Sequence, residues 1–113
     1  MRVTAHSLIV SGELLTERER QLRDEDWSYD HDDGHAAGQL ASMASSYALL
    51  AAADACGPDS HWGPILRSRA FANNPFDEEW LKTHPQRRKL VIAGALIIAE
   101  IERLDRLERS RTP

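Results

Sequence analysis

Apolar residues recur at a helical spacing in three stretches of the chain, the first of which lies near its N-terminus. Leu8, Leu15 and Leu22 stand seven residues apart with Leu14 beside them, and the other faces of this stretch are filled largely by charged residues. The spacing predicts an amphipathic helix. Because residues 9–12 make a poor helix interior, the pattern leaves two possibilities for residues 1–10: helical turns or an extended arm.

The second stretch runs from about Gly34 to Cys56 and is rich in alanine and serine. Its larger apolar side chains fall on one face, and these are Leu40, Met43, Tyr47 and Leu50. Because the remaining side chains are mostly small, we expect another helix to approach closely. Asp32 or Asp33 can cap the start of this helix, and Gly57-Pro58 is a strong stop signal.

Residues 57–85 form a long connection that contains prolines at positions 58, 64, 75 and 85. A connection of this length inside a compact domain is unusual and often functional. We expect it to hold one short helix, which Asp77 caps and which a contact between Phe76 and Leu81 secures. Its aromatic residues predict that the segment folds over the bundle, and these are Trp62, Phe71, Phe76 and Trp80.

The third helix opens at Thr83 and Gln86, which have the spacing of a capping box. From Leu90 to Ile101 it is apolar nearly all round, which indicates burial on more than one side. In a small domain, the simplest cover for such a helix is a second copy of the chain. The sequence then becomes polar, and we expect residues 108–113 to fray.

These elements predict one all-α domain over residues 1–113. We expect a small helical bundle of three main helices and one short helix, which forms a homo-oligomer through its apolar third helix. The chain has 113 residues, of which 42% are hydrophobic. A domain this short leaves part of its apolar surface uncovered, which also favours an oligomer.

Charge and cysteine content narrow the class of protein. The formal net charge is −4 and the pI is near 5.7, which argues against a protein that binds duplex nucleic acid by neutralising phosphates. Cys56 is the only cysteine, so a reducing compartment fits. The apolar run at residues 8–10 is too short for a secretory signal, and the run at residues 90–99 is too short to span a membrane. We therefore expect a cytoplasmic protein.

The densest group of metal-ligating residue types is His31-Asp32-Asp33-Gly34-His35. Two carboxylates and two imidazoles can supply oxygen and nitrogen ligands to a divalent ion, and Asp32, Asp33 and His35 are the candidates. The alternative is a loop that ends in an aspartate N-cap, with both histidines exposed. The spacing does not separate these two possibilities.

Further acidic pairs lie on the first and third helices. Glu102 and Asp105 share one helix face, where their charges repel unless a cation lies between them. Glu17 stands one turn after Glu13 on the first helix. Together with the aspartates at the start of the second helix, carboxylates from three helices can therefore face one Mg²⁺ site. Ordinary surface charge is the alternative for both pairs. Glu100 lies among apolar residues, and a buried carboxylate needs a partner.

Arg87, Arg88 and Lys89 lie in the first turns of the third helix, where positive charge opposes the helix dipole. They predict an anion site, because free N–H groups at a helix start favour phosphate. Ion pairing with the acidic residues 77–79 is the alternative. Trp27 and Trp80 can stack on a base, although tryptophans in a small domain commonly belong to the core.

Three runs in this chain resemble a group of small phage and prophage proteins, and they are ERERQLRDEDW, HDDGHAAGQLASMASSYAL and RRKLVIAGALIIAEIERLDR. The resemblance spans roughly residues 13–107 and implies a phage-type protein that acts in a bacterial cytoplasm. The group commonly has Gly-Glu-Leu where this chain has Gly38-Gln39-Leu40. If that glutamate served a metal, this chain has lost it.

A more distant similarity is to the MazG-type all-α nucleotide pyrophosphohydrolases. Those enzymes bind Mg²⁺ through E-x-x-E on one helix and E-x-x-D on a later one. Here residues 102–105 read E-x-x-D, whereas no clean E-x-x-E precedes them. The similarity implies a catalytic role for Glu102 and Asp105.

Two functions follow from these patterns, and a purely structural phage component is a third possibility that the patterns leave open. The first is a Mg²⁺-dependent hydrolysis of a nucleoside triphosphate to its monophosphate and pyrophosphate, with Glu17, Glu102 and Asp105 among the metal ligands and the basic residues 87–89 on the phosphates. The second is a non-catalytic anti-defence protein that sequesters a nucleotide signal or inhibits a host defence protein. The glutamine at position 39 favours the second function.

Overall fold

The computed structural model describes residues 2–24, 38–74, 81 and 83–111, and within these ranges the chain is all-α with no strand. The described helices are α1 (Ala5–Asp24), α3 (Gln39–Asp54), α4 (Trp62–Asn73) and α5 (Gln86–Arg111). The predicted all-α class is therefore confirmed. None of these helices combines the length and hydropathy that a membrane span requires.

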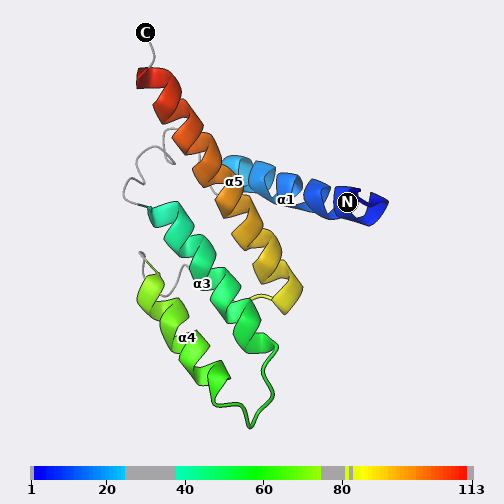
Figure 1. Ribbon diagram of the computed structural model, residues 1–113, viewed down its shortest axis with the longest axis vertical. Coiled ribbons are helices and arrows are strands. Elements are labelled where there is room, and N and C mark those ends of the chain that lie inside the picture. The colour runs from blue at the N-terminus through cyan, green and yellow to red at the C-terminus, as the bar shows by residue number, and fades with distance from the viewer. Residues whose placement is uncertain (1, 25–37, 75–80, 82, 112–113) are drawn as a thin grey trace.

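Three of the helices form a layer and the other crosses it. Helix α3 packs against both α4 and α5 and runs antiparallel to each of them (Figure 1). Helix α1 packs against α5, and its N-terminal end projects away from the layer (Figure 1). The molecule therefore has two kinds of helix contact, one inside the layer and one at the crossing.

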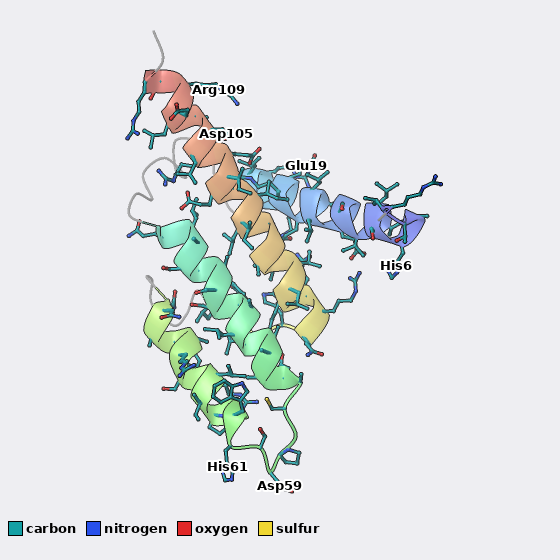
Figure 2. All side chains as sticks on the ribbon, viewed as in Figure 1. His6, Glu19, Asp59, His61, Asp105 and Arg109 are labelled. Atoms are coloured by element: carbon teal, nitrogen blue, oxygen red, sulfur yellow. The ribbon has the colours of Figure 1, made fainter. Side chains whose placement is uncertain are left out.

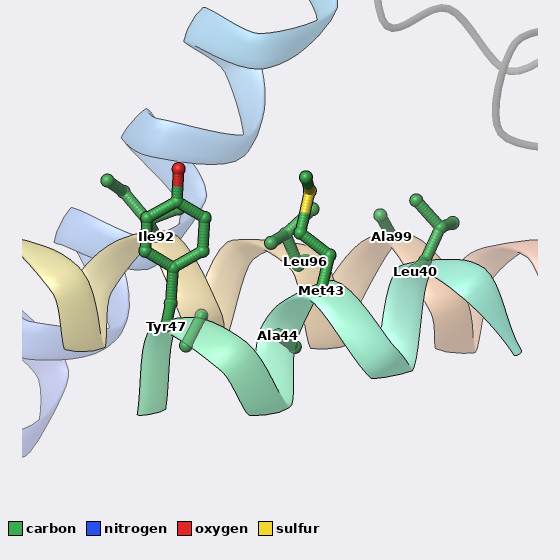
Figure 3. Packing of buried hydrophobic residues seen from close by; sticks show 8 residues of the cluster. Leu40, Met43, Ala44, Tyr47, Ile92, Leu96 and Ala99 are labelled. Carbon is green, nitrogen blue, oxygen red and sulfur yellow. The ribbon is translucent and has the colours of Figure 1, made fainter. Parts of the chain in front are cut away.

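The hydrophobic core lies between α3 and α5 (Figure 3). Its larger side chains interleave with the alanines of the facing helix, and they are Leu40, Met43, Tyr47, Ile92 and Leu96. This arrangement confirms the predicted face of α3 at positions 40, 43 and 47, whereas Leu50 is only partly buried. On the opposite face of α3, the buried Ser46 hydroxyl donates to the Ala70 carbonyl of α4 at 2.8 Å.

The ends of α1 and α5 extend the picture that the sequence gives. Helix α1 begins at Ala5, where the Thr4 hydroxyl accepts the Ser7 N–H at 3.0 Å, so of the two possibilities for this segment residues 5–10 are helical. Helix α5 continues to Arg111, and the expected fraying of residues 108–113 stays a prediction.

The long connection contains a helix that the sequence analysis did not place. Helix α4 occupies Trp62–Asn73, ahead of the short helix expected near Asp77, which lies outside the described residues and stays a prediction. Pro64 stands in its first turn, where a missing backbone N–H costs no intrahelical hydrogen bond, and the Ser60 hydroxyl accepts the Trp62 N–H at 3.1 Å. Phe76 and Asp77, the proposed staple and cap, lie outside the described residues.

The packed face of α1 also differs from the one its leucine spacing indicates. Leu8 and Leu15 are 65% and 59% exposed. Leu14 instead reaches α5 at Gly94, where a Cβ atom would lie 2.7 Å from a Leu14 methyl carbon. The backbones of α1 and α5 therefore approach closely at Gly94, and the sevenfold leucine row points elsewhere.

Candidate functional site

Ion pairs join α1 to α5 where the two helices cross. Arg87 binds the Glu13 carboxylate through both terminal nitrogens at 2.5 and 2.6 Å. The Arg18 Nε donates to Glu102 at 2.9 Å. Arg88 donates to Glu17, which is the most enclosed carboxylate of the group. Helix α1 is therefore held across α5 largely by charged side chains that flank the contact between Leu14 and Gly94.

Glu17 is the centre of this network and is only 2% exposed. Its Oε1 accepts hydrogen bonds from Arg20 Nε at 2.7 Å and from Arg88. Its Oε2 accepts from Arg20 Nη2 at 2.9 Å and from Gln21 Nε2 at 3.1 Å. The carboxylate is thus enclosed by donors, as a buried charge requires.

The protonation states of Glu13 and Glu17 follow from these contacts. Burial acts to raise the pKa of Glu17, but the hydrogen bonds and charges of Arg20 and Arg88 outweigh it, so the pKa lies below its ordinary value. The hydrogen bonds from Arg87 lower the pKa of Glu13, and Glu13 in turn raises the pKa of Arg87. Both glutamates are therefore ionised at neutral pH.

A cavity of about 680 Å³ opens beside the crossing. Arg20, Arg23 and Arg88 line it together with Glu13 and Glu17, and Ile9 and Val91 add apolar residues to the lining. We call this cavity the arginine groove. Arg20 and Arg88 are partly exposed and Arg23 is 65% exposed, so all three cations remain accessible to a ligand. The volume is in the range of small-molecule sites.

The predicted catalytic pair lies apart from the groove. Glu102 pairs with Arg18, whereas Asp105 is exposed on the carboxyl-terminal part of α5, beyond the crossing (Figure 2). These two acidic residues line a smaller cavity of about 210 Å³ together with Arg106 and Arg109.

The remaining predicted metal ligands do not form a described centre. Over the described ranges, no three histidine, cysteine or acidic side chains lie close enough to hold a metal ion. Glu17 is enclosed by arginines and does not belong to such a group. Asp32, Asp33 and His35 lie outside the described residues. The Mg²⁺ site therefore stays a prediction.

The basic residues at the start of α5 separate into different environments. Arg87 and Arg88 pair with Glu13 and Glu17 of α1, and Lys89 pairs with Asp54 of α3. Of these three residues only Arg88 lines the arginine groove. All three residues are thus ion-paired, and their described partners belong to α1 and α3. Residues 77–79, the partners that the sequence suggested, lie outside the described residues.

Two further side chains, the partly buried Glu100 and the buried Gln21, complete the environment. Glu100 finds the partner it needs in Arg103, whose Nε lies 2.5 Å from its Oε1. Gln21 is fully buried, and its Oε1 accepts no hydrogen bond from the described residues. The predicted stacking residues Trp27 and Trp80 lie outside the described ranges.

Sequence reasoning missed Arg20 and Arg23 as candidate ligand residues. They stand three residues apart on α1, and this spacing places them near one another on a helix. A run that alternates Glu and Arg reads as ordinary surface charge, so only the approach of Arg88 singles them out.

Comparison with models of known protein families gave no match, and neither the curated proteins nor the solved structures yielded a significant similarity. A function for this chain is therefore inferred from its own residues.

Proposed function

We propose that the protein binds a phosphorylated nucleotide in the arginine groove without hydrolysing it. The observation that carries this proposal is the convergence of Arg20, Arg23 and Arg88 on one cavity. Guanidinium groups bind phosphate oxygens through paired, charge-assisted hydrogen bonds. A phosphate that enters the groove can therefore replace water on the accessible side of these cations.

The charge balance of the groove supports an anionic ligand. Three arginines line it against two glutamates, and Glu13 is already held through both oxygens by Arg87. The lining thus keeps more positive than negative charge, although Arg20 and Arg88 also bind Glu17. Ile9 and Val91 offer apolar contact for the less polar part of a nucleotide, which distinguishes this ligand from a bare phosphate ion.

The hydrogen bonds that the groove carboxylates already accept favour binding of a nucleotide over its hydrolysis. Each Glu17 oxygen accepts two hydrogen bonds from arginine or glutamine donors. Metal-assisted hydrolysis needs carboxylate oxygens that can face a metal ion, and the groove glutamates are oriented toward cationic side chains instead. Sequestration of a nucleotide signal, one of the two predicted functions, fits this arrangement.

The test is calorimetric titration of the full chain with nucleoside mono-, di- and triphosphates and cyclic dinucleotides, each with and without Mg²⁺. Arg23→Glu is the informative variant, because its exposed pair with Glu19 contributes little to folding. Loss of a charge-assisted contact predicts about 10- to 100-fold weaker binding. Arg67→Glu, the same change on the exposed face of α4, is the matched control and should bind normally.

The ligand is then recovered and analysed for cleavage. An intact ligand with a selective loss in Arg23→Glu supports the proposal. Absence of binding across the whole panel, or equal losses in both variants, overturns it. Magnesium-dependent release of pyrophosphate would replace it with the hydrolase function.

A further inference from the structure

A second surface of the molecule consists of rows of exposed aliphatic side chains on two helices. On α5, Leu90, Ile97, Ile101 and Leu104 are each between 49% and 53% exposed; we call this row the α5 stripe. On α1, the corresponding row is Leu8, Leu15 and Leu22, of which the first two are more than half exposed; we call it the α1 stripe. Exposed aliphatic rows of this kind mark interaction sites.

The two stripes match one another in period and length. Leu90, Ile97 and Leu104 recur every seven residues, as do the three leucines of α1. Fourteen residues of helix span about 21 Å, so the rows are equally long. A sevenfold repeat of large aliphatic residues is the pattern by which two helices pack lengthwise.

Within one chain the stripes do not pack lengthwise. Helix α1 crosses α5 and contacts it through Leu14 at Gly94. On its other side α5 buries Ile92 and Leu96 against α3. The α5 stripe thus lies between two occupied faces and is left half exposed.

The N-terminal half of α1 also lacks support from the described layer. Residues 2–9 are all exposed, and the end of the helix that carries His6 projects away from the other helices (Figure 2). A few helical turns without tertiary packing are marginal in water. A partner that covers the α1 stripe would supply this packing.

We infer that a second copy of the chain covers both rows, so that the α1 stripe of each copy packs along the α5 stripe of the other. The matched period and length favour this partner, because each row already has its counterpart on the same chain. A stable interface buries about 800 Å² per partner, so an exchange that engages two rows of each copy favours stability more than contact through one row. A reciprocal exchange engages both rows of each copy and closes with twofold symmetry.

This inference is independent of the proposed ligand, since the arginine groove lies within one chain. The test is light scattering after size exclusion of the full chain over a range of concentrations. The expected mass is that of a dimer. Ile101→Glu and Leu15→Glu, one in each stripe, should each give monomers, whereas the control Ile65→Glu, at an exposed aliphatic position of α4, should remain a dimer.

Cross-linking tests the pairing without relying on disruption. In a Cys56→Ser background, Leu15→Cys combined with Ile97→Cys should form an intermolecular disulfide on mild oxidation, and helix content by circular dichroism should be unchanged. A monomeric wild type, a closed assembly larger than a dimer, or a dimer insensitive to both glutamates overturns the inference. A dimer that yields no cross-link and responds only to Ile101→Glu would also overturn it, in favour of pairing between two α5 helices.

Discussion

The contact of α5 with α3 and its contact with α1 rely on different physical forces. Toward α3, α5 buries Ile92 and Leu96 against Met43 and Tyr47, with alanines filling the space between them. Toward α1, the enclosed side chains are polar or charged, chiefly Glu17 and Gln21. The first contact is stabilised by removal of apolar surface from water. The second depends on complementary charges, whose desolvation offsets much of their attraction.

This difference separates a structural layer from an attached helix. The layer of α3, α4 and α5 should persist under conditions that weaken ion pairs, whereas α1 should detach first. Since the arginine groove is built from both α1 and α5, detachment of α1 abolishes the groove while the layer stays folded. The following changes test that separation, each at one fixed protein concentration because self-association alters apparent stability.

The largest effect is expected from Leu96→Ala in the centre of the α3–α5 contact. Leu96 is fully buried, so its truncation leaves a cavity and should lower the free energy of unfolding by about 2–5 kcal/mol. Urea denaturation followed by circular dichroism measures this loss. Ile65→Ala on the exposed face of α4 is the control and should cost well under half as much. Equal losses would contradict the assignment of the core.

Glu17→Gln should have the next largest effect and should act mainly on α1. The change removes the negative charge that Arg20 and Arg88 bind. Hydrogen bonds to charged groups contribute about 1.5–3 kcal/mol each, but water can solvate the partly exposed arginines and so reduce the net loss. We expect a loss of about 1–3 kcal/mol, with faster amide hydrogen exchange in α1 than in α3. Glu19→Gln removes an exposed pair on the same helix and should cost about 0.5 kcal/mol or less. Uniformly faster exchange in all helices would contradict a separable α1.

Acid should also detach α1, because it neutralises the carboxylates of both Glu13 and Glu17. The pKa values of Glu13 and Glu17 are lowered in the folded chain. Their contribution to stability is therefore fully present above the ordinary glutamate pKa of about 4.3 and is lost as the pH falls through the lower folded values. Hydrogen exchange at stepwise lower pH, corrected for intrinsic rates, should show α1 opening before α3. Loss of protection in both helices at the same pH would count against this order.

The smallest expected effect distinguishes two glycines. Replacing a helical glycine by alanine stabilises a helix by up to about 1 kcal/mol. Gly12 has no atom within 4 Å of its would-be Cβ, whereas Gly94 faces Leu14 at 2.7 Å. Thermal denaturation should show that Gly12→Ala stabilises the chain and that Gly94→Ala gains less or loses stability. Adding Leu14→Ala to Gly94→Ala should relieve the clash. If the stability changes of the two substitutions simply add in the double variant, the two residues are not in close contact at this crossing.

The sequence predicted the layer better than the crossing. The face of α3 at Leu40, Met43 and Tyr47, its stop before Gly57-Pro58 and the start of α5 near Gln86 all follow from periodicity and terminator residues. Helix α4 was not predicted, because Pro64 reads as an interruption, although a proline in the first turn is compatible with a helix. The candidate site was recovered in part, since Glu17 and Arg88 were named but were assigned to metal and phosphate and not to each other.

What the sequence determined by itself is the helical class and the apolar faces that spacing along one helix defines. Periodicity describes each helix in isolation, however, and it does not say which neighbour a face meets. Glu17 and Arg88 are 71 residues apart, and only the crossing of α1 over α5 brings them together with Arg20 and Arg23. The same crossing uses Leu14 and Gly94 as its contact and leaves the sevenfold leucine row outside. Tertiary structure alone decided these features, because they depend on the angle and closeness of two helices and not on the pattern within either one.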